Sequence, residues 1–448
     1  MSYGKDVYYE PADAFAPERA VIFGVQLDAQ NDAETNESMN ELAALTKAAG
    51  AVVVGRHEQK RGAPDPTYYI GSGKVEEIAS TVKETEADLV IFDDELSPAQ
   101  ARNIEKKTGV RALDRSGLIL DIFADRAKTR EARLQVELAQ LEYLLPRLTR
   151  AWTHLERQAG AGGAGAAGGG GGGGAPIGLR GPGETQLETD RRLIGIRIAN
   201  LKRELEHIER VRSTQRAGRF DVWKIALVGY TNAGKSTLMR ALTGADVHIE
   251  NQLFATLDST TRSFDLAPNK PVVLTDTVGF IRKLPHHLVA SFRSTLSEAR
   301  EADIVLHVVD ASHPNAAEQI AVVREVLDEM DIRPPHTILV MNKIDQIDAA
   351  DPESTVLPSK LAGGMPHVDI SAVTGTGLDR LRDELAACIE AEMVELEVRV
   401  PQANGKLISR IHDRGEVLSR SYERNDVILR ARLRRADANM IESELAIP

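Results

Sequence analysis

An eight-residue glycine loop between an apolar strand and a helix constrains this chain more than any other feature. The apolar run at 223–228 leads into GYTNAGKS at 229–236, and a helical pattern follows directly. The spacing G-x-x-x-x-G-K-S in this context is typical of a phosphate-binding loop, because Gly229 and Gly234 let successive backbone N–H groups point inward. The start of the helix adds a partial positive charge. The pattern predicts an α/β domain with a mostly parallel sheet that binds a nucleoside phosphate.

The same loop supplies candidate ligands for phosphate and metal. Lys235 is expected to bridge the β- and γ-phosphates, and the Ser236 hydroxyl is expected to bind Mg²⁺. We expect the nucleotide to contact Gly229, Tyr230, Thr231, Asn232, Ala233, Gly234, Lys235, Ser236 and Thr237.

Three further motifs follow in the order that a guanine-nucleotide switch requires. The first is DTVG at 276–279, where Asp276 is expected to hold the Mg²⁺ shell and the Gly279 amide to sense the γ-phosphate. The second is NKID at 342–345, where the Asp345 carboxylate can accept hydrogen bonds from two guanine donors that adenine does not present. The third is the loop at Ser371 and Ala372, after the strand pattern HVDI at 367–370, whose backbone can contact the guanine carbonyl. Together the motifs predict binding of GTP and GDP. The other residues of these motifs expected to contact the nucleotide are Thr277, Val278, Asn342, Lys343 and Ile344.

A second hydroxyl on the metal is expected from the loop FATLDSTT at 254–261, which offers Thr256, Thr260 and Thr261. What catalyses hydrolysis is less obvious, because Phe280 follows DTVG where small signalling GTPases place a glutamine that orients water. We therefore expect slow intrinsic GTP turnover. Asn232 matches an asparagine that ligates K⁺ in some cation-activated GTPases, although it is equally compatible with a plain loop residue.

The periodicity divides the chain into four parts. Residues 1–120 alternate strands and helices and predict an N-terminal α/β domain around a mainly parallel sheet. Residues 121–219 predict an antiparallel helical hairpin arm, with helices at 130–152 and 184–216 joined by a mobile glycine-rich loop at 160–176. The GTPase domain is expected at 220–392. The tail, 393–448, predicts a small α+β appendage, with a strand at 395–401, a helix at 405–417 and a strand at 426–435.

The arm is basic on a chain whose net charge is −12. Its helical stretches, 126–158 and 177–219, hold seventeen Lys or Arg against ten Asp or Glu. A basic projection on an acidic body is a plausible footprint for nucleic acid, although a solvated helix pair would have a similar composition. The single cysteine, Cys388, excludes a disulfide framework and fits a reducing compartment. The sequence contains no run of 18 uncharged apolar residues, so no membrane span is predicted and we expect a cytoplasmic protein. We also expect a monomer.

Three stretches together resemble the HflX family of ribosome-associated GTPases. They are GLRGPGETQLE at 178–188, FATLD at 254–258 and DTVGFIRKLP at 276–285. From the motifs we expect Lys235, Thr256 and Gly279 to act in hydrolysis. The resemblance implies that FATLD, 254–258, is the switch loop and that Thr256 is its metal ligand. It adds Phe254, Ala255, Leu257 and Asp258 to the nucleotide site.

The resemblance also implies a function. Family members bind the large ribosomal subunit, bacterial members split ribosomes, and the arm reaches ribosomal RNA near the peptidyl-transferase centre. We expect GTP hydrolysis that the ribosome stimulates. Two alternatives stay open: a checkpoint in large-subunit assembly, and a signalling switch that binds a protein effector.

The segment GSGK at 71–74 is a weaker phosphate signal, because it lacks the eight-residue spacing. We therefore expect this segment to be a turn that leads into a helix. The resemblance keeps an ATP site in the N-terminal domain as an alternative.

Overall fold

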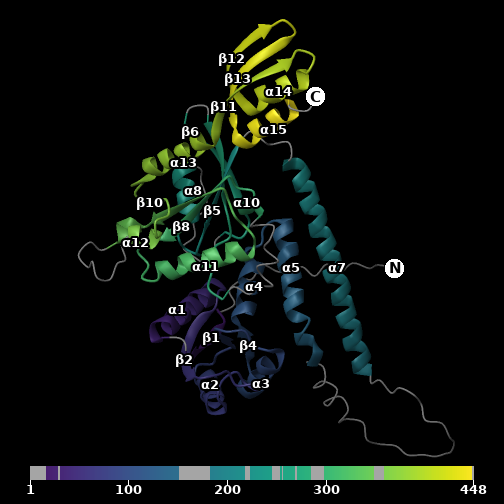
Figure 1. The fold of residues 1–448 in the computed structure, drawn as a ribbon. Helices are drawn as coiled ribbons and strands as arrows, with labels where there is room; N and C mark the ends of the chain where they lie inside the picture. The colour runs from purple at the N-terminus through teal and green to yellow at the C-terminus, as the bar shows by residue number, and fades with distance from the viewer. Residues whose placement is uncertain are drawn as a thin grey trace, which may run out of the picture. The chain divides into compact units, whose positions relative to one another are not determined.

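The computed structural model of the protein describes residues 17–28, 31–150, 182–216, 222–244, 253–254, 256–267, 270–283, 297–347 and 358–445 (Figure 1). The chain divides into two compact units. One comprises Met1–Asp125 and Val136–Ile198, and the other comprises Arg126–Gln135 and Ala199–Pro448. Ala255 and the glycine-rich loop at 160–176, both named in the sequence predictions, lie outside the described residues.

The first unit contains a four-stranded parallel sheet, which confirms the mainly parallel sheet predicted there. Its strands are ordered β2-β1-β3-β4, with β1 at Arg19–Leu27, β2 at Val52–Arg61, β3 at Leu89–Phe92 and β4 at Arg111–Asp114. The helices are α1 Asp32–Ala48, α2 Ser72–Glu84, α3 Pro98–Thr108 and α4 Arg115–Arg126. All of β3 and most of β1 are buried, which explains why both read as continuous apolar runs.

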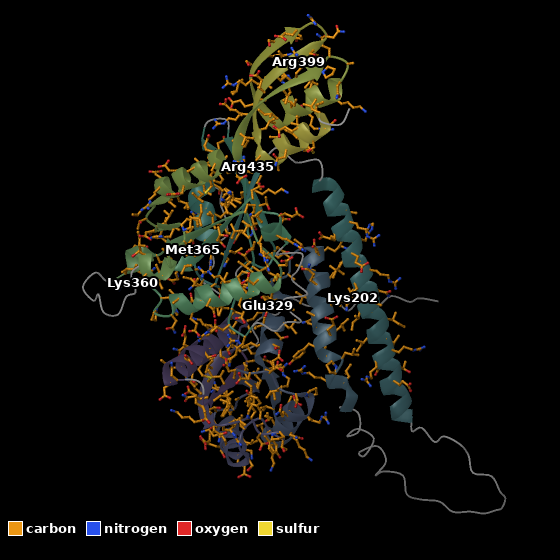
Figure 2. The ribbon with its side chains drawn as sticks, viewed as in Figure 1. Lys202, Glu329, Lys360, Met365, Arg399 and Arg435 are labelled. Carbon is orange, nitrogen blue, oxygen red and sulfur yellow. The ribbon has the colours of Figure 1, made fainter. Side chains whose placement is uncertain are left out.

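The arm consists of α5 Arg130–Leu144, a 3-10 turn at Arg147–Arg150 and α7 Pro182–Arg216. Arg130 pairs with Glu204, and Arg197 pairs with Glu137, so α5 and α7 run antiparallel as predicted. Figure 2 shows Lys202 among the side chains that project from α7.

The first arm helix is shorter than its sequence pattern predicted. It ends at Leu144, two residues before Pro146, whereas the prediction extended it to residue 152. A proline removes one backbone donor and disfavours helical geometry at the preceding residue, so it ends a helix that the apolar periodicity alone would continue.

The GTPase domain contains a six-stranded sheet ordered β10-β9-β8-β5-β7-β6, in which all neighbours are parallel except β6 and β7. Its elements are β5 Trp223–Gly229, α8 Lys235–Thr243, β6 Thr260–Ala267, β7 Lys270–Asp276, α10 Ser297–Arg300, β8 Ile304–Asp310, α11 Ala316–Glu329, β9 His336–Asn342, the 3-10 helix η2 Ile344–Gln346, α12 Pro358–Ala362, β10 His367–Asp369 and α13 Leu378–Glu392.

Helices cover both faces of this sheet. Buried residues of α8 and α13 share one apolar cluster with the inward side chains of β5, β8 and β9, and α11 packs against the opposite face. The parallel strands β5, β7, β8 and β9 end at one edge, where open α/β sheets bind their ligands. The loops that carry the predicted motifs therefore meet there.

The tail forms a three-stranded antiparallel sheet ordered β11-β13-β12, with two helices. Its elements are β11 Met393–Pro401, α14 Gly405–Arg414, β12 Gly415–Glu423, β13 Asp426–Arg434 and α15 Arg435–Leu445. The predicted strand, helix and strand are present, but β12 and α15 were missed. The prediction continued the helix past Gly415, whose backbone is extended and whose Cβ would lie 2.4 Å from Leu433 Cδ2. Close pairing with β13 ends the helix there.

Candidate functional site

The phosphate loop joins β5 to α8 through two positions that exclude a side chain. Gly229 has φ +154°, and a Cβ there would lie 2.2 Å from the carbonyl oxygen of Val308. Gly234 has φ +96°, and its Cβ would lie 2.3 Å from Asn342 Nδ2. Only glycine combines this backbone geometry with this closeness, which is why the motif needs glycine at both places.

Lys235 begins α8 and is buried, with 7% of its surface exposed. Its ammonium donates hydrogen bonds to the carbonyl oxygens of Gly229, at 3.1 Å, and Tyr230, at 2.9 Å. Burial lowers the pKa of Lys235 to about 8, and the nearby Asp276 carboxylate opposes that shift. Phosphate oxygens beside this ammonium would favour its charged form, so the lysine is placed to bind an anion.

Three oxygen-bearing side chains from separate segments converge beside the loop. Ser236 Oγ donates to Asp276 Oδ2 at 2.6 Å, and Thr256 Oγ1 donates to the same oxygen at 3.1 Å. The two hydroxyl oxygens are 3.0 Å apart. Hydroxyl and carboxylate oxygens are the ligands that Mg²⁺ prefers.

Asp276 carries a further sign that a cation fits. Its Oδ1 is buried and has no hydrogen-bond partner among the described residues. Burial raises the pKa of Asp276, while Lys235, Ser236 and Thr256 act in the opposite direction. A divalent cation would satisfy the free oxygen and favour the ionised carboxylate, so these residues suit Mg²⁺.

The other candidate threonines of the switch loop lie elsewhere. Thr260 pairs with Asp276 in the β6–β7 ladder, and Thr261 Oγ1 lies 3.1 Å from Thr275 Oγ1. Both are therefore engaged with the edge of the sheet. Thr256 is the member of this group whose hydroxyl lies in the oxygen cluster.

The DTVG loop rests on the phosphate loop. Thr231 N–H donates to the Phe280 carbonyl at 2.7 Å, and Phe280 N–H donates to the Gly229 carbonyl at 3.1 Å. A Cβ on Gly279 would lie 3.1 Å from Lys235 Nζ, so this backbone passes directly over the phosphate lysine. The Phe280 side chain is 2% exposed, and an apolar ring cannot orient an attacking water.

The predicted base pocket is built around Asn342. Its Nδ2 donates to the Ala233 carbonyl at 2.9 Å, and its Oδ1 accepts the Ala372 N–H at 3.0 Å. This side chain therefore ties the phosphate loop to the loop that follows β10. Asp345 is exposed on η2, where its carboxylate is open to a ligand.

One residue of this pocket was missed by the sequence reasoning. Asp310 ends β8 and accepts a hydrogen bond from Lys343 Nζ at 2.6 Å, in a pair that is largely buried. Lys343 has the left-handed φ of +66°. The signal available in the sequence was an acidic residue at the end of the apolar run IVLHVVD.

The remaining predicted residues are split between these loops. Thr237 follows Ser236 on α8, Thr277 donates to the Leu227 carbonyl at 2.7 Å, and Val278 is buried. Asn232 is exposed with φ +60°, while Phe254 and Leu257 are buried. Asp258 points to a different partner, the start of α5. Ile344 and Ser371 lie in the base loops.

The GSGK segment forms a turn into α2. The Gly71 N–H, one of the groups that a phosphate would use, donates to Gln59 Oε1 at 3.0 Å. Lys74 Nζ pairs with Glu77 at 2.7 Å. This geometry favours the turn interpretation of that segment.

A phosphate loop, an oxygen cluster and a base pocket thus meet at the carboxyl edge of one mostly parallel sheet. Together they define a P-loop GTPase, and comparisons with known proteins identify which one. Family models match the chain as follows: GTP-binding GTPase N-terminal at 36–124, GTP-binding GTPase Middle Region at 126–219, 50S ribosome-binding GTPase at 224–343, and HflX C-terminal domain at 357–447.

Curated relatives give the same result. GTPase HflX of Escherichia coli strain K12 is 45% identical over 399 residues, which cover 89% of each chain. GTPase HflX of Akkermansia muciniphila is 41% identical over 438 residues, which cover 96% of this chain and 97% of the relative. The chain belongs to the HflX family of GTPases.

A solved structure of a GTP-binding protein from the archaeon Sulfolobus solfataricus, in complex with GDP, is 25% identical. It covers 83% of this chain and 98% of its own, with a TM-score of 0.43. Separately, no helix in the described part of the chain is long and apolar enough to cross a membrane.

Proposed function

We propose that the protein is a cytoplasmic, monomeric GTPase that binds the large ribosomal subunit in its GTP form and splits or remodels ribosomes. The observation that carries this proposal is a basic helical arm on a switch domain matched by the family described as 50S ribosome-binding GTPase. The exposed Lys and Arg side chains of α7 suit the phosphate backbone of ribosomal RNA.

Within the site, the residues divide the work. Lys235 and the amides of the phosphate loop, residues 229–236, bind the phosphates, and the Gly279 amide reads the γ-phosphate. Ser236, Thr256 and Asp276 would hold Mg²⁺, which supplies positive charge against the phosphate oxygens. Asp345 selects guanine. Hydrolysis then releases the Thr256 loop, which is the usual conformational change of such switches.

The site lacks a polar water-orienting side chain at Phe280, so we propose slow intrinsic turnover that the ribosome accelerates. K⁺ bound at Asn232 would add positive charge near the developing transition state. Asn232 is exposed on the phosphate loop and stands in the left-handed conformation that asparagine tolerates.

The K⁺ assignment predicts a cation effect on turnover. GTP hydrolysis at equal ionic strength should be roughly tenfold faster in KCl than in NaCl, because Na⁺ is too small for the same ligand set. Asn232→Gly keeps the positive φ and removes the amide, so it should abolish the difference. Equal rates of the native protein in both salts would show that Asn232 is an ordinary loop residue.

The arm predicts binding that depends on both charge and nucleotide. In co-sedimentation with ribosomes, the non-hydrolysable GTP analogue should give more pelleting than GDP. Reversing two exposed charges on α7, Arg191→Glu with Arg192→Glu, should weaken that pelleting by about tenfold and flatten its salt dependence. GTP affinity should be unchanged.

The matched control reverses the same charge away from the arm, as Lys106→Glu with Lys107→Glu on the exposed face of α3. Pelleting that ignores nucleotide would favour a signalling switch with a protein effector. Nucleotide-dependent pelleting with subunits but no loss of whole ribosomes would favour an assembly checkpoint.

A further inference from the structure

The carboxylate of Asp258, in the switch loop, is bound to the first arm helix. Its Oδ2 accepts the backbone N–H groups of Lys128, at 3.0 Å, and Thr129, at 3.1 Å. Its Oδ1 accepts the Thr129 hydroxyl at 2.5 Å. One carboxylate thus engages three donors contributed by residues 129 and 130 positions away in the sequence.

The three donors are at the beginning of α5. The Thr129 hydroxyl also accepts the Ala132 N–H at 3.1 Å, so Thr129 caps the helix while donating to Asp258. A negative charge is stabilising at this end of a helix, where the first N–H groups lack intrahelical partners. The contact is therefore attractive both through its hydrogen bonds and through the helix dipole.

The other end of the same short segment is at the oxygen cluster. Thr256 lies two residues before Asp258, and its hydroxyl is 3.0 Å from Ser236 Oγ and 3.1 Å from Asp276 Oδ2. Leu257, between them, is 2% exposed and packed into the protein. A three-residue segment with both ends held and its centre buried has little room to adjust one end without the other.

We propose that Asp258 is a positioning residue that fastens the Thr256 loop to the start of α5, so that closing the loop on a nucleoside triphosphate and ordering the arm's first helix are one event. The inference rests on the proposed role of Thr256 at the metal. Through thermodynamic linkage, the contact at α5 then raises affinity for the triphosphate, and the triphosphate stabilises the contact. GDP has no γ-phosphate to order the Thr256 loop, so it gains little.

The first test compares affinities for a non-hydrolysable GTP analogue and for GDP. Asp258→Asn removes the charge at constant shape, and Thr129→Val removes the hydroxyl. Each should weaken binding of the GTP analogue by about tenfold and change GDP binding by less than about twofold. The double variant should lose little more than either single one, because both break the same contact. Thr129→Ser should retain the native preference.

A matched control is Asp265→Asn, an exposed carboxylate on β6 that follows the same loop. It should leave both affinities unchanged. Thr256→Ala serves as the reference for the metal assignment. If Thr256→Ala leaves the preference for the GTP analogue over GDP intact, the proposed role of Thr256 at the metal is wrong. That result is distinct from a failure of the link to Asp258 alone.

The second test reads the contact directly, by hydrogen exchange of the backbone amides of Lys128 and Thr129. Both amides donate to Asp258, so they should exchange more slowly with the GTP analogue than with GDP, and Asp258→Asn should remove the difference. An equal loss of affinity for GDP and the GTP analogue would mean that Asp258 only stabilises the start of α5 and does not couple it to the triphosphate. An Asp258→Asn protein with native affinities and native exchange would overturn the inference outright.

Discussion

Replacing Lys235 by alanine is expected to reduce affinity for GTP and GDP by roughly 10²–10³-fold, because a buried cation at the proposed phosphate site is lost. Titration calorimetry measures this directly. A thermal readout follows from the same loss. Nucleotide at about 100 times the dissociation constant stabilises a binding protein by about 2.7 kcal/mol, and the variant should show almost none of this gain.

The matched control is Lys360→Ala, an exposed lysine on α12 (Figure 2). It should retain native affinity and the native rise in melting temperature. If Lys235→Ala bound GTP as the native protein does, the phosphate site would have to lie elsewhere in the chain.

Replacing Asp345 by asparagine is expected to lower GTP affinity by about 100-fold, because the amide has one acceptor oxygen for two guanine donors and its NH₂ opposes the other donor. The same variant should gain affinity for xanthosine triphosphate, whose base presents a carbonyl where guanine presents an amino group. The asparagine amide can donate to that carbonyl. Competition against a fluorescent nucleotide gives both affinities in one assay.

Asp328→Asn, an exposed acidic residue on α11, is the control for the Asp345 change. It should discriminate between guanine and xanthine as the native protein does. A loss of GTP binding without any gain for xanthosine triphosphate would mean that Asp345 shapes its loop and does not contact the base.

Much of the GTPase domain was predictable because its chemistry is local in sequence. The glycines at 229 and 234 are needed by the turn itself, because its backbone takes φ of +154° and +96° there, which other residues rarely adopt. Each motif directly follows an apolar run, so its place at the carboxyl end of a strand could be read from the pattern. The parallel N-terminal sheet and the antiparallel arm followed from periodicity in the same way.

The errors lie where long-range contacts override local preference. The predicted helix at 405–417 is too long, because Gly415 pairs with β13 and starts β12. The prediction missed β12 because this strand is mostly exposed and lacks an alternating buried pattern. Asp310 can accept a hydrogen bond from Lys343 because β8 and β9 pair in a register that places Asp310 opposite Asn342. Neither register nor partner is present in a local stretch of sequence.

The sequence by itself determined the class of nucleotide, the proposed phosphate-binding loop and the alternation of strands and helices, because each is read from short motifs or local patterns. The motif left three threonines of the switch loop open, and the family resemblance favoured Thr256. Only the tertiary structure shows its hydroxyl beside Ser236 and Asp276, and where Asp258 points. The carboxylate of Asp258 and the hydroxyl of Thr129 are 129 positions apart in the chain. Their hydrogen bond exists only because folding brings one loop of the sheet edge to the first turn of the arm.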